Sequence, residues 1–175
     1  IAELTQNFVD AGVRALNVGF DVLELHAAHG YLFHQFMSPL SNQRSDEYGG
    51  NFEGRIRFLL ETARALRSAI ADSVPLFVRI SATDWVEGGW SIEDSVQLAM
   101  QLQKVGVDLI DVSSGGLVDY AKISVAPSYQ VPFAQKIKND VGILTSAVGL
   151  IMEPEQAQEI IASGKADAVM LARAM

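Results

Sequence analysis

The chain has 175 residues, 49% of them hydrophobic and 19% charged, which is ordinary for a globular protein. Its formal net charge of −8, without any cluster of lysine and arginine, argues against a nucleic-acid partner, because binding phosphates requires clustered positive charge. The absence of cysteine excludes disulfides and thiolate chemistry within these residues, and no apolar run has the length of a membrane span. Since the chain begins with Ile1 rather than methionine, we expect it to be part of a longer protein.

Helical and strand-like patterns alternate along the chain. Helices are predicted where apolar residues recur every three to four positions, and strands where short apolar runs occur. The last helix has Pro154 near its start and Gly164 at its end, the polarity typical of these two residues. In chain order the predicted elements are a helix over 1–15, a strand over 20–27, a helix over 52–70, a strand over 75–82, a helix over 92–105, a strand over 107–116, a helix over 132–140, a strand over 141–149, a helix over 153–165 and a strand over 166–173.

Strands that alternate with helices predict a parallel sheet, because parallel neighbours need crossover connections. Both an open doubly wound sheet and a (β/α)8 barrel have this order. One face of each of the first three strands carries polar residues, whereas the opposite faces are apolar. A sheet covered by helices on both sides would be apolar on both faces, so the pattern favours a barrel interior. The residues of the partly polar faces are Val22, Glu24 and His26; Phe77, Arg79 and Ser81; and Leu109, Asp111 and Ser113.

We therefore predict a single α/β domain over residues 1–175, a (β/α)8 TIM barrel present as an incomplete barrel of about five βα units. Active sites of such barrels lie at the carboxyl ends of the strands. The longest connection, "HAAHGYLFHQFMSPLSNQRSDEYGGNFEGR", begins at one such end. A loop of this length at that end of a barrel is more often functional than not.

All three histidines of the chain, His26, His29 and His34, lie at the start of this connection. Residues three apart on a strand point to opposite faces, so His26 and His29 converge only if the chain turns after His26, which Gly30 permits. Together with Tyr31, the pair could bind a metal, exchange protons, donate hydrogen bonds to a substrate oxygen or serve only in packing. A zinc site would need a third ligand nearby, and the spacing matches no zinc motif.

Arg79 lies in the middle of an otherwise apolar strand. A guanidinium in a barrel interior needs an anion or several acceptors, because burying it unpaired is costly. Glu24 and Asp111, on the strands on either side, could supply an internal ion-pair network. Alternatively, Arg79 faces an electron-rich cofactor or substrate while these carboxylates hold it, and the two interpretations are compatible.

Two other segments are candidates for binding and bracing. Gly149 and Arg173 close the last two strands, where barrels often bind phosphate through backbone N–H groups. Arg44, Asp46 and Tyr48, in "SNQRSDEYGG", are interpreted as a brace for the long loop rather than as catalytic residues.

The stretch "HAAHGYLFHQFMSPLSNQRSDEYGGNFEGRIRF" closely resembles the old yellow enzyme family of FMN-dependent ene-reductases and NADPH dehydrogenases. The segments "FVRISATDWVEGGW", "GVDLIDVSSGG" and "SAVGLI…ADAVMLARAM" continue the resemblance in the order of the family. It covers essentially the whole chain, and it implies a (β/α)8 barrel with FMN at its C-terminal mouth. The segments resemble strands four to eight of that barrel, and the His–His pair is similar to the bacterial thermophilic-like branch.

The resemblance implies roles for individual residues. His26 and His29 match the donors to the carbonyl or nitro oxygen of an activated alkene, and Tyr31 matches the proton donor. Arg79 matches the arginine beside the flavin pyrimidine ring. Ala172 and Arg173 match the flavin-phosphate segment of the family, in which glycine often stands where this chain has Ala172. His34 is left as a residue that packs the loop, and no metal is implied.

The mechanism implied by the resemblance is ping-pong. NAD(P)H delivers hydride to flavin N5, and the alkene then accepts that hydride at its β-carbon. The histidine pair stabilises the developing enolate charge, and Tyr31 protonates the α-carbon. We expect a cytoplasmic enzyme acting on a small enone or nitro substrate, without nucleic-acid or membrane partners, and a homo-oligomer at full length.

One departure from the family pattern lies in the loop. Where the family usually has Glu-Asn-Arg after the double glycine, this chain has Glu53, Gly54 and Arg55. The loss of the asparagine is expected to weaken the bracing of the loop without touching a catalytic atom.

Two other readings compete with an ene-reductase. The chain could be the barrel domain of a larger flavoenzyme of the 2,4-dienoyl-CoA reductase or trimethylamine dehydrogenase type, for which a cysteine cluster beyond Met175 would be evidence. It could also be inert as isolated, because five strands cannot close an eight-stranded barrel and leave two parallel edges exposed. We expect the isolated piece to bind FMN poorly and to aggregate.

Overall fold

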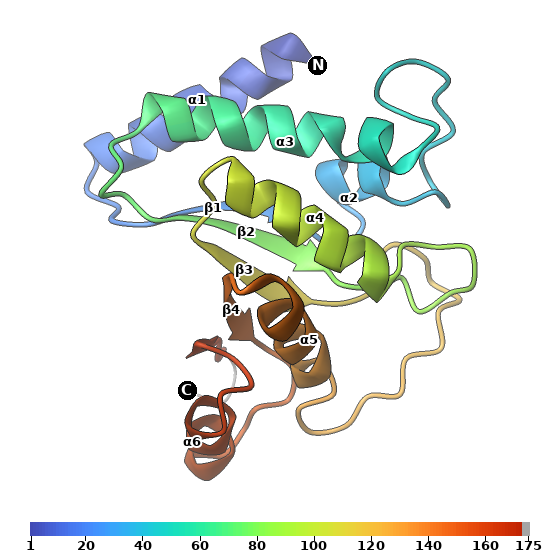
Figure 1. Cartoon of the computed structure of the whole chain (residues 1–175), viewed down its shortest axis with the longest axis vertical. Helices are drawn as coiled ribbons and strands as arrows, with labels where there is room; N and C mark the ends of the chain where they lie inside the picture. The colour runs from blue at the N-terminus through green and yellow to red at the C-terminus, as the bar shows by residue number, and fades with distance from the viewer. Residues whose placement is uncertain (173–175) are drawn as a thin grey trace.

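A computed structural model of the protein describes residues 1–172, in which five parallel strands form a single sheet. The strands pair in sequence order, each with the next, so every connection is a crossover that carries at least one helix (Figure 1). The strands are β1 (Leu23–Ala27), β2 (Leu76–Ser81), β3 (Leu109–Ser113), β4 (Leu144–Ala147) and β5 (Ala168–Val169). The helices are α1 (Ala2–Asn17), α2 (Leu32–Met37), α3 (Phe52–Ala69), α4 (Ile92–Lys104), α5 (Val131–Val141) and α6 (Pro154–Ala162).

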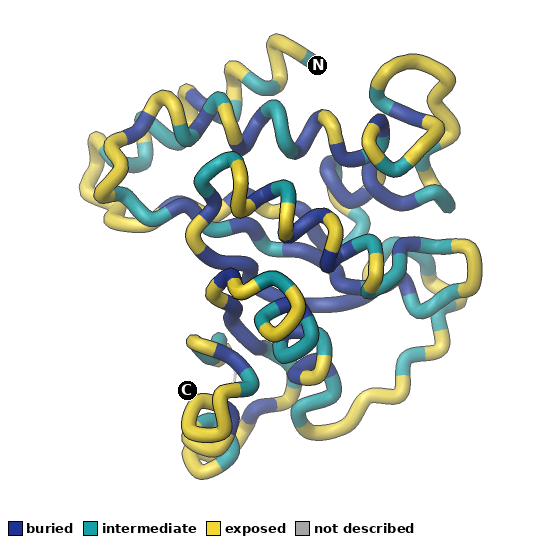
Figure 2. Tube along the Cα trace, viewed as in Figure 1, coloured by how far each residue is buried: buried dark blue, intermediate teal, exposed yellow. Residues whose placement is uncertain are grey.

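The helices cover one face of the sheet, and α1, α3, α4 and α5 follow one another along it (Figure 1). Burial alternates along β1 accordingly: Leu23 and Leu25 are buried in the core, whereas Glu24 and His26 are exposed on the open face. Figure 2 shows that the strands beneath the helices are largely buried, whereas the helices expose their outer sides. A doubly wound sheet would have helices on both faces. The one-sided cover confirms the predicted barrel-type arrangement of successive βα units. No helix within the described residues is long and apolar enough to cross a membrane.

Local capping explains where two of the helices begin. The Asn51 side chain accepts a hydrogen bond from the backbone N–H of Gly54 at 2.9 Å, which satisfies one free donor at the start of α3. At the start of α4, Ser91 and Asp94 form a reciprocal capping box. The predicted helix at the end of the chain is also confirmed: Pro154 is the first residue of α6, and Gly164 follows it with a φ of 72°.

The connection after β1 is not the continuous loop that the sequence predicted, because it contains the short helix α2. Phe33 and Met37, one turn apart, are fully buried in the core, and the Phe33 ring packs against Phe58 of α3. The apolar spacing of Phe33, Phe36 and Met37 is helical and was the available signal. It was missed because the run is only six residues long.

Strand β5, Ala168–Val169, is shorter than the predicted run over 166–173, of which residue 173 lies outside the described residues. Within the described part of the chain, β5 pairs only with β4, and β1 pairs only with β2. Two flanking backbone bonds, Asp167 N to Thr145 O and Met170 N to Ala147 O, extend the contact with β4 at both ends. With a partner on one side only, the strand has half the ladder bonds that would keep it regular.

The loop between α2 and α3 is braced in part as predicted. The Tyr48 hydroxyl donates to Glu61 Oε2 of α3 at 3.0 Å, and the Asn42 amide donates to the carbonyl oxygen of Tyr48 at 2.8 Å. Arg44 and Asp46 pair with each other at the surface, and Asp46 Oδ1 also accepts the backbone N–H of Tyr48 at 3.2 Å. The brace therefore rests on Tyr48, Asn42 and the Asp46 carboxylate, whereas the surface ion pair between Arg44 and Asp46 itself contributes little.

Gly54 has no room for a side chain in this fold. A Cβ built on it would lie 2.1 Å from the carbonyl oxygen of Gly49, which is backbone and cannot move aside easily. We expect Gly54→Ala to destabilise the protein by about 1 to 3 kcal/mol, although alanine favours helix over glycine. Chemical denaturation at equilibrium would measure the change.

The matched control is Gly12→Ala, at the other helical glycine that is closely approached. There the nearest atom is Leu66 Cδ1 at 2.6 Å, the end of a flexible side chain that can rotate away. We expect this change to alter the unfolding free energy by no more than about 1 kcal/mol. Equal losses in both variants would show that the Gly49 carbonyl is not the obstacle.

Candidate active site

Polar side chains form one continuous row across the open face of the sheet. The register aligns His26 of β1 with Arg79 of β2, Arg79 with Asp111 of β3, and Asp111 with Ser146 of β4. Because parallel strands in register present aligned residues on the same face, these four side chains are neighbours. The structure thus brings together the polar positions that the sequence placed on one face.

Of the two carboxylates that the sequence suggested as partners, Arg79 forms an ion pair with Asp111 and not with Glu24 within the described residues. Its Nε lies 3.2 Å from Asp111 Oδ2, and the Ser146 hydroxyl donates to the other Asp111 oxygen at 2.6 Å. Asp111 is 1% exposed, so its charge depends on these two partners. Glu24 lies near but forms no ion pair with Arg79 within the described residues. Partial desolvation at the sheet surface raises its pKa, as does the charge of Asp111, while Arg79 opposes both.

The Arg79 guanidinium is not fully used by this pair. Its Nε is buried without a hydrogen-bonded partner in the described residues, because the N–H does not point along the short contact to Asp111. The side chain remains 28% exposed on the open face. Arg79 is therefore held by a carboxylate while donors remain for a further acceptor.

The two histidines converge through a tight turn, as the sequence required. After β1 the chain enters the left-handed region at both His29, with a φ of 58°, and Gly30, with a φ of 75°. The turn brings the ring centroids of His26 and His29 to 5.3 Å, and those of His26 and Tyr31 to 5.6 Å. Tyr31 is 65% exposed, so its hydroxyl is accessible from the open side.

Both histidines of the pair are neutral near pH 7. Burial, followed by the positive charge of Arg79, lowers the pKa of His29 to about 4. The same two effects lower the pKa of His26, although Asp111 opposes them. A neutral imidazole has a single N–H, so each ring can donate one hydrogen bond.

The ring of His29 is engaged by a residue that the sequence placed on the polar face without assigning it a role. Its Nε2 lies 2.7 Å from Ser113 Oγ, which in turn lies 3.3 Å from Gln130 Oε1. The amide oxygen of Gln130 only accepts, so the Ser113 hydroxyl donates to it and accepts from His29 Nε2–H. Ser114 also donates to this oxygen, at 2.6 Å. Gln130 is a contact that sequence reasoning missed, because a glutamine before a helix carries no distinguishing pattern.

His34 is separate from the pair, as expected for a residue that packs the loop. It is fully buried, and its ring lies between the backbone N–H of Gly30 and the carboxylate of Asp84. Among residues 1–172, no three histidine, aspartate or glutamate side chains are grouped so that they could hold a metal ion.

Two of the three predicted phosphate-binding positions line one cavity. Gly149, in the loop after β4, and Ala172, after β5, border a cavity of about 540 Å³ whose wall also includes Tyr129 and Gln130. Gly149 has a φ of 116°, a backbone conformation that favours glycine, and a Cβ there would lie 2.6 Å from Gln130 Nε2. Arg173 lies outside the described residues.

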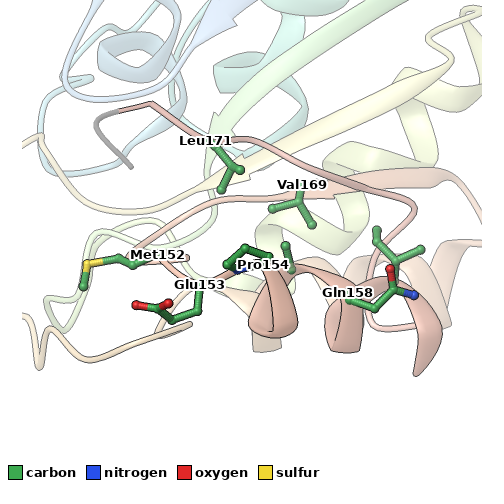
Figure 3. A pocket seen from close by; sticks show the side chains of 8 residues that line it. Met152, Glu153, Pro154, Gln158, Val169 and Leu171 are labelled. Atoms are coloured by element: carbon green, nitrogen blue, oxygen red, sulfur yellow. The ribbon is translucent and has the colours of Figure 1, made fainter. Parts of the chain in front are cut away.

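A second cavity, of about 420 Å³, lies beside α6 and adjoins the first. Figure 3 shows the side chains that line it. Pro154 and Gln158 of α6 line it, together with Val169 of β5. Met152 and Leu171 border both cavities. This cavity lies at the open edge of the sheet and contains none of the predicted site residues.

The profile of the NADH:flavin oxidoreductase / NADH oxidase family matches residues 1–175, the whole chain. The chain belongs to this family. The membership confirms the resemblance to old yellow enzymes, and the family is one of oxidoreductases with FMN as cofactor and NAD(P)H as reductant.

Relatives in this family support the same assignment. NADPH dehydrogenase from Bacillus velezensis is 52% identical over 173 residues, which are 99% of this chain and 50% of that protein. The old yellow enzyme homologue from Zymomonas mobilis superposes with a TM-score of 0.79 at 26% identity, covering 98% of this chain and 48% of that one. 2-Naphthoyl-CoA reductase gives a TM-score of 0.87 at 25% identity, over 96% of this chain and 26% of that one.

The chain spans about half the length of the curated relatives that it matches. With the barrel fold of its structural neighbours, this confirms that the five βα units are part of a (β/α)8 barrel.

Proposed function

We propose that the full-length protein is an FMN-dependent NAD(P)H oxidoreductase that reduces the C=C bond of α,β-unsaturated carbonyl or nitro compounds. The observation that carries the proposal is the convergence of two neutral imidazoles, His26 and His29, with the accessible phenol of Tyr31. They lie beside Arg79, at the ends of the strands where barrel enzymes have their active sites.

The residues present are suited to FMN. The Arg79 side chain is 28% exposed on the open face, so its guanidinium can donate to the electron-rich pyrimidine edge of a flavin, and Asp111 keeps its charge in place. Gly149 and Ala172 line one cavity and can present backbone to a phosphate without side-chain obstruction. When bound, FMN supplies the redox chemistry, taking hydride from NAD(P)H and passing it to the alkene.

His26 and His29 bind the substrate oxygen in this proposal. Two preorganised donors stabilise the negative charge that grows on this oxygen as the alkene is reduced, as in an oxyanion hole. Neutral rings suit the role, because the pKa of His29, about 4, leaves it uncharged at neutral pH. His29 has one N–H, which now points to Ser113, so substrate binding moves this hydrogen bond from the serine to the substrate oxygen.

The reaction can be tested in two half-reactions on the full-length protein. Under anaerobic conditions, NADPH should bleach the flavin absorbance, and cyclohexenone should then restore it. Bleaching without recovery by any enone or nitroalkene would contradict the proposed substrate class. No bleaching with either NADH or NADPH would contradict the oxidoreductase itself.

Tyr31 is proposed as the acid that protonates the α-carbon. We expect Tyr31→Phe to slow reoxidation of the flavin by cyclohexenone by roughly 100-fold, the usual contribution of a general acid, and to spare its reduction by NADPH. Stopped-flow absorbance would measure the two steps separately. Tyr120→Phe, at a tyrosine of similar exposure, is the control and should alter neither step. Equal slowing of both steps by Tyr31→Phe would instead indicate a structural role.

A further inference from the structure

The turn that brings His29 to His26 is conformationally demanding. Two consecutive residues, His29 and Gly30, have φ angles of 58° and 75°. The left-handed region is unfavourable for a residue with a Cβ, by roughly 1 to 2 kcal/mol. His29 carries this cost, whereas a glycine would not. Other contacts must therefore hold the turn, and the site of the His29 ring depends on them.

Side chains hold the backbone N–H groups of both residues. The N–H of His29 donates to Ser81 Oγ at 2.9 Å, and the Ser81 hydroxyl donates to the carbonyl oxygen of Gly115 at 2.7 Å. The N–H of Gly30 donates to Nδ1 of His34 at 3.0 Å. One acceptor comes from the end of β2 and the other from α2, so the turn is tied to two different elements.

Asp84 fixes the ring of His34 in the form that can accept this bond. Asp84 Oδ1 lies 2.8 Å from His34 Nε2, and Oδ2 accepts from the Ser38 hydroxyl at 2.6 Å and the Trp90 N–H at 2.8 Å. Burial alone would raise the pKa of Asp84, but hydrogen bonds from His34, Ser38 and Trp90 hold it below its usual value. An ionised carboxylate only accepts, so His34 Nε2 carries the proton and Nδ1 presents its lone pair to Gly30.

The turn also packs against the end of β3 with no spare room. A Cβ on Gly30 would lie 2.5 Å from the carbonyl oxygen of Gly116, and a Cβ on Gly116 would lie 2.8 Å from the Cα of His29. The backbone of the turn is thus fixed on one side by Gly116 and on the other by His34. Loss of the His34 contact removes one of these constraints on Gly30, and His29 is covalently next to it.

We propose that His34 is a positioning residue that sets the distance between the two substrate-binding imidazoles. Held by Asp84, it accepts the N–H of Gly30 and so keeps the left-handed turn that places His29 beside His26. It contacts neither substrate nor flavin, and the inference rests on the proposed role of His26 and His29 as paired donors.

Two variants separate the two hydrogen bonds of the His34 ring, one with the Gly30 N–H and one with Asp84. His34→Asn places an amide oxygen near the position of Nδ1, so the Gly30 acceptor is kept while the reach to Asp84 is lost. His34→Gln places an amide nitrogen near the position of Nε2, so Asp84 keeps a donor while the Gly30 N–H loses its acceptor. A histidine that serves only in packing would make the variants differ in stability alone.

The test uses the full-length FMN-loaded protein and three measurements. These are binding of para-chlorophenol by the change in flavin absorbance, exchange of the Gly30 amide by NMR, and the melting temperature. We expect His34→Gln to weaken phenol binding roughly tenfold and to speed Gly30 exchange, since a partly buried N–H is left without a partner. His34→Asn should keep phenol affinity and Gly30 protection near wild type, even if it melts at a lower temperature.

The inference is overturned if phenol affinity follows melting temperature in both variants, or if His34→Gln leaves Gly30 exchange unchanged. A measurement on the wild type covers the case in which a variant does not fold. Isotope-edited NMR of the ring nitrogens should show His34 protonated at Nε2 only, and a proton on Nδ1 would refute the role. If the wild type binds no phenol, the proposed function fails, whereas Gly30 exchange and the tautomer still decide the role of His34.

Discussion

Replacing both His26 and His29 by alanine should slow reduction of cyclohexenone by about 100- to 1,000-fold, the loss typical when oxyanion donors are removed. Binding of phenols should weaken in parallel, because their oxygen would occupy the same position between the rings. Reduction of the flavin by NADPH should change far less, since it does not involve a substrate oxygen. Stopped-flow kinetics of the two half-reactions would measure both effects.

The control for this prediction is His29→Asn. Asparagine offers an N–H donor and tolerates the left-handed region better than alanine, so it should conserve the turn at a φ of 58° and much of the activity. His29→Ala alone removes the donor and also strains the backbone. If the double alanine variant bound phenols and reduced alkenes like the wild type, the assignment of the pair as substrate donors would be wrong.

Replacing Arg79 by methionine should lower the unfolding free energy by about 3 kcal/mol and abolish tight FMN binding. The stability loss arises because Asp111, 1% exposed, would keep only the Ser146 hydroxyl as a partner for its charge. The loss of FMN arises because the remaining donors of the guanidinium disappear. Urea denaturation and quenching of FMN fluorescence on the full-length protein would measure the two effects.

Two further variants separate stability from flavin binding. Arg79→Lys keeps a positive charge near Asp111, so it should recover stability while binding FMN more weakly, because lysine lacks the planar fork of donors. Adding Asp111→Asn to Arg79→Met removes the unpaired charge and should restore stability but not FMN binding. Full recovery of FMN binding in this double variant would show that Arg79 acts only as the partner of Asp111.

Much of the site could be predicted because it follows from local patterns. The alternation in β1 already placed Glu24 and His26 on the face opposite Leu23 and Leu25, as the structure shows. In the same way, a single arginine in the apolar run of β2 indicated a partnered charge. The end of β5 and the helix α2 were predicted less well, because an edge strand has few ladder bonds and a six-residue helix has little periodicity.

The sequence alone determined the alternation of helices and strands, the polar face, the candidate side chains His26, His29 and Tyr31, and the family resemblance that the family match confirms. Each of these depends on residues close together in the chain.

Tertiary structure alone decided the contacts of the turn. His29 meets Ser113, and His34 meets Asp84, across 84 and 50 residues of chain. Such pairs depend on strand register and on how α2 packs, and no local pattern encodes them. The sequence named the histidines, while the fold determined which of them face the open side of the sheet and which is fixed behind it.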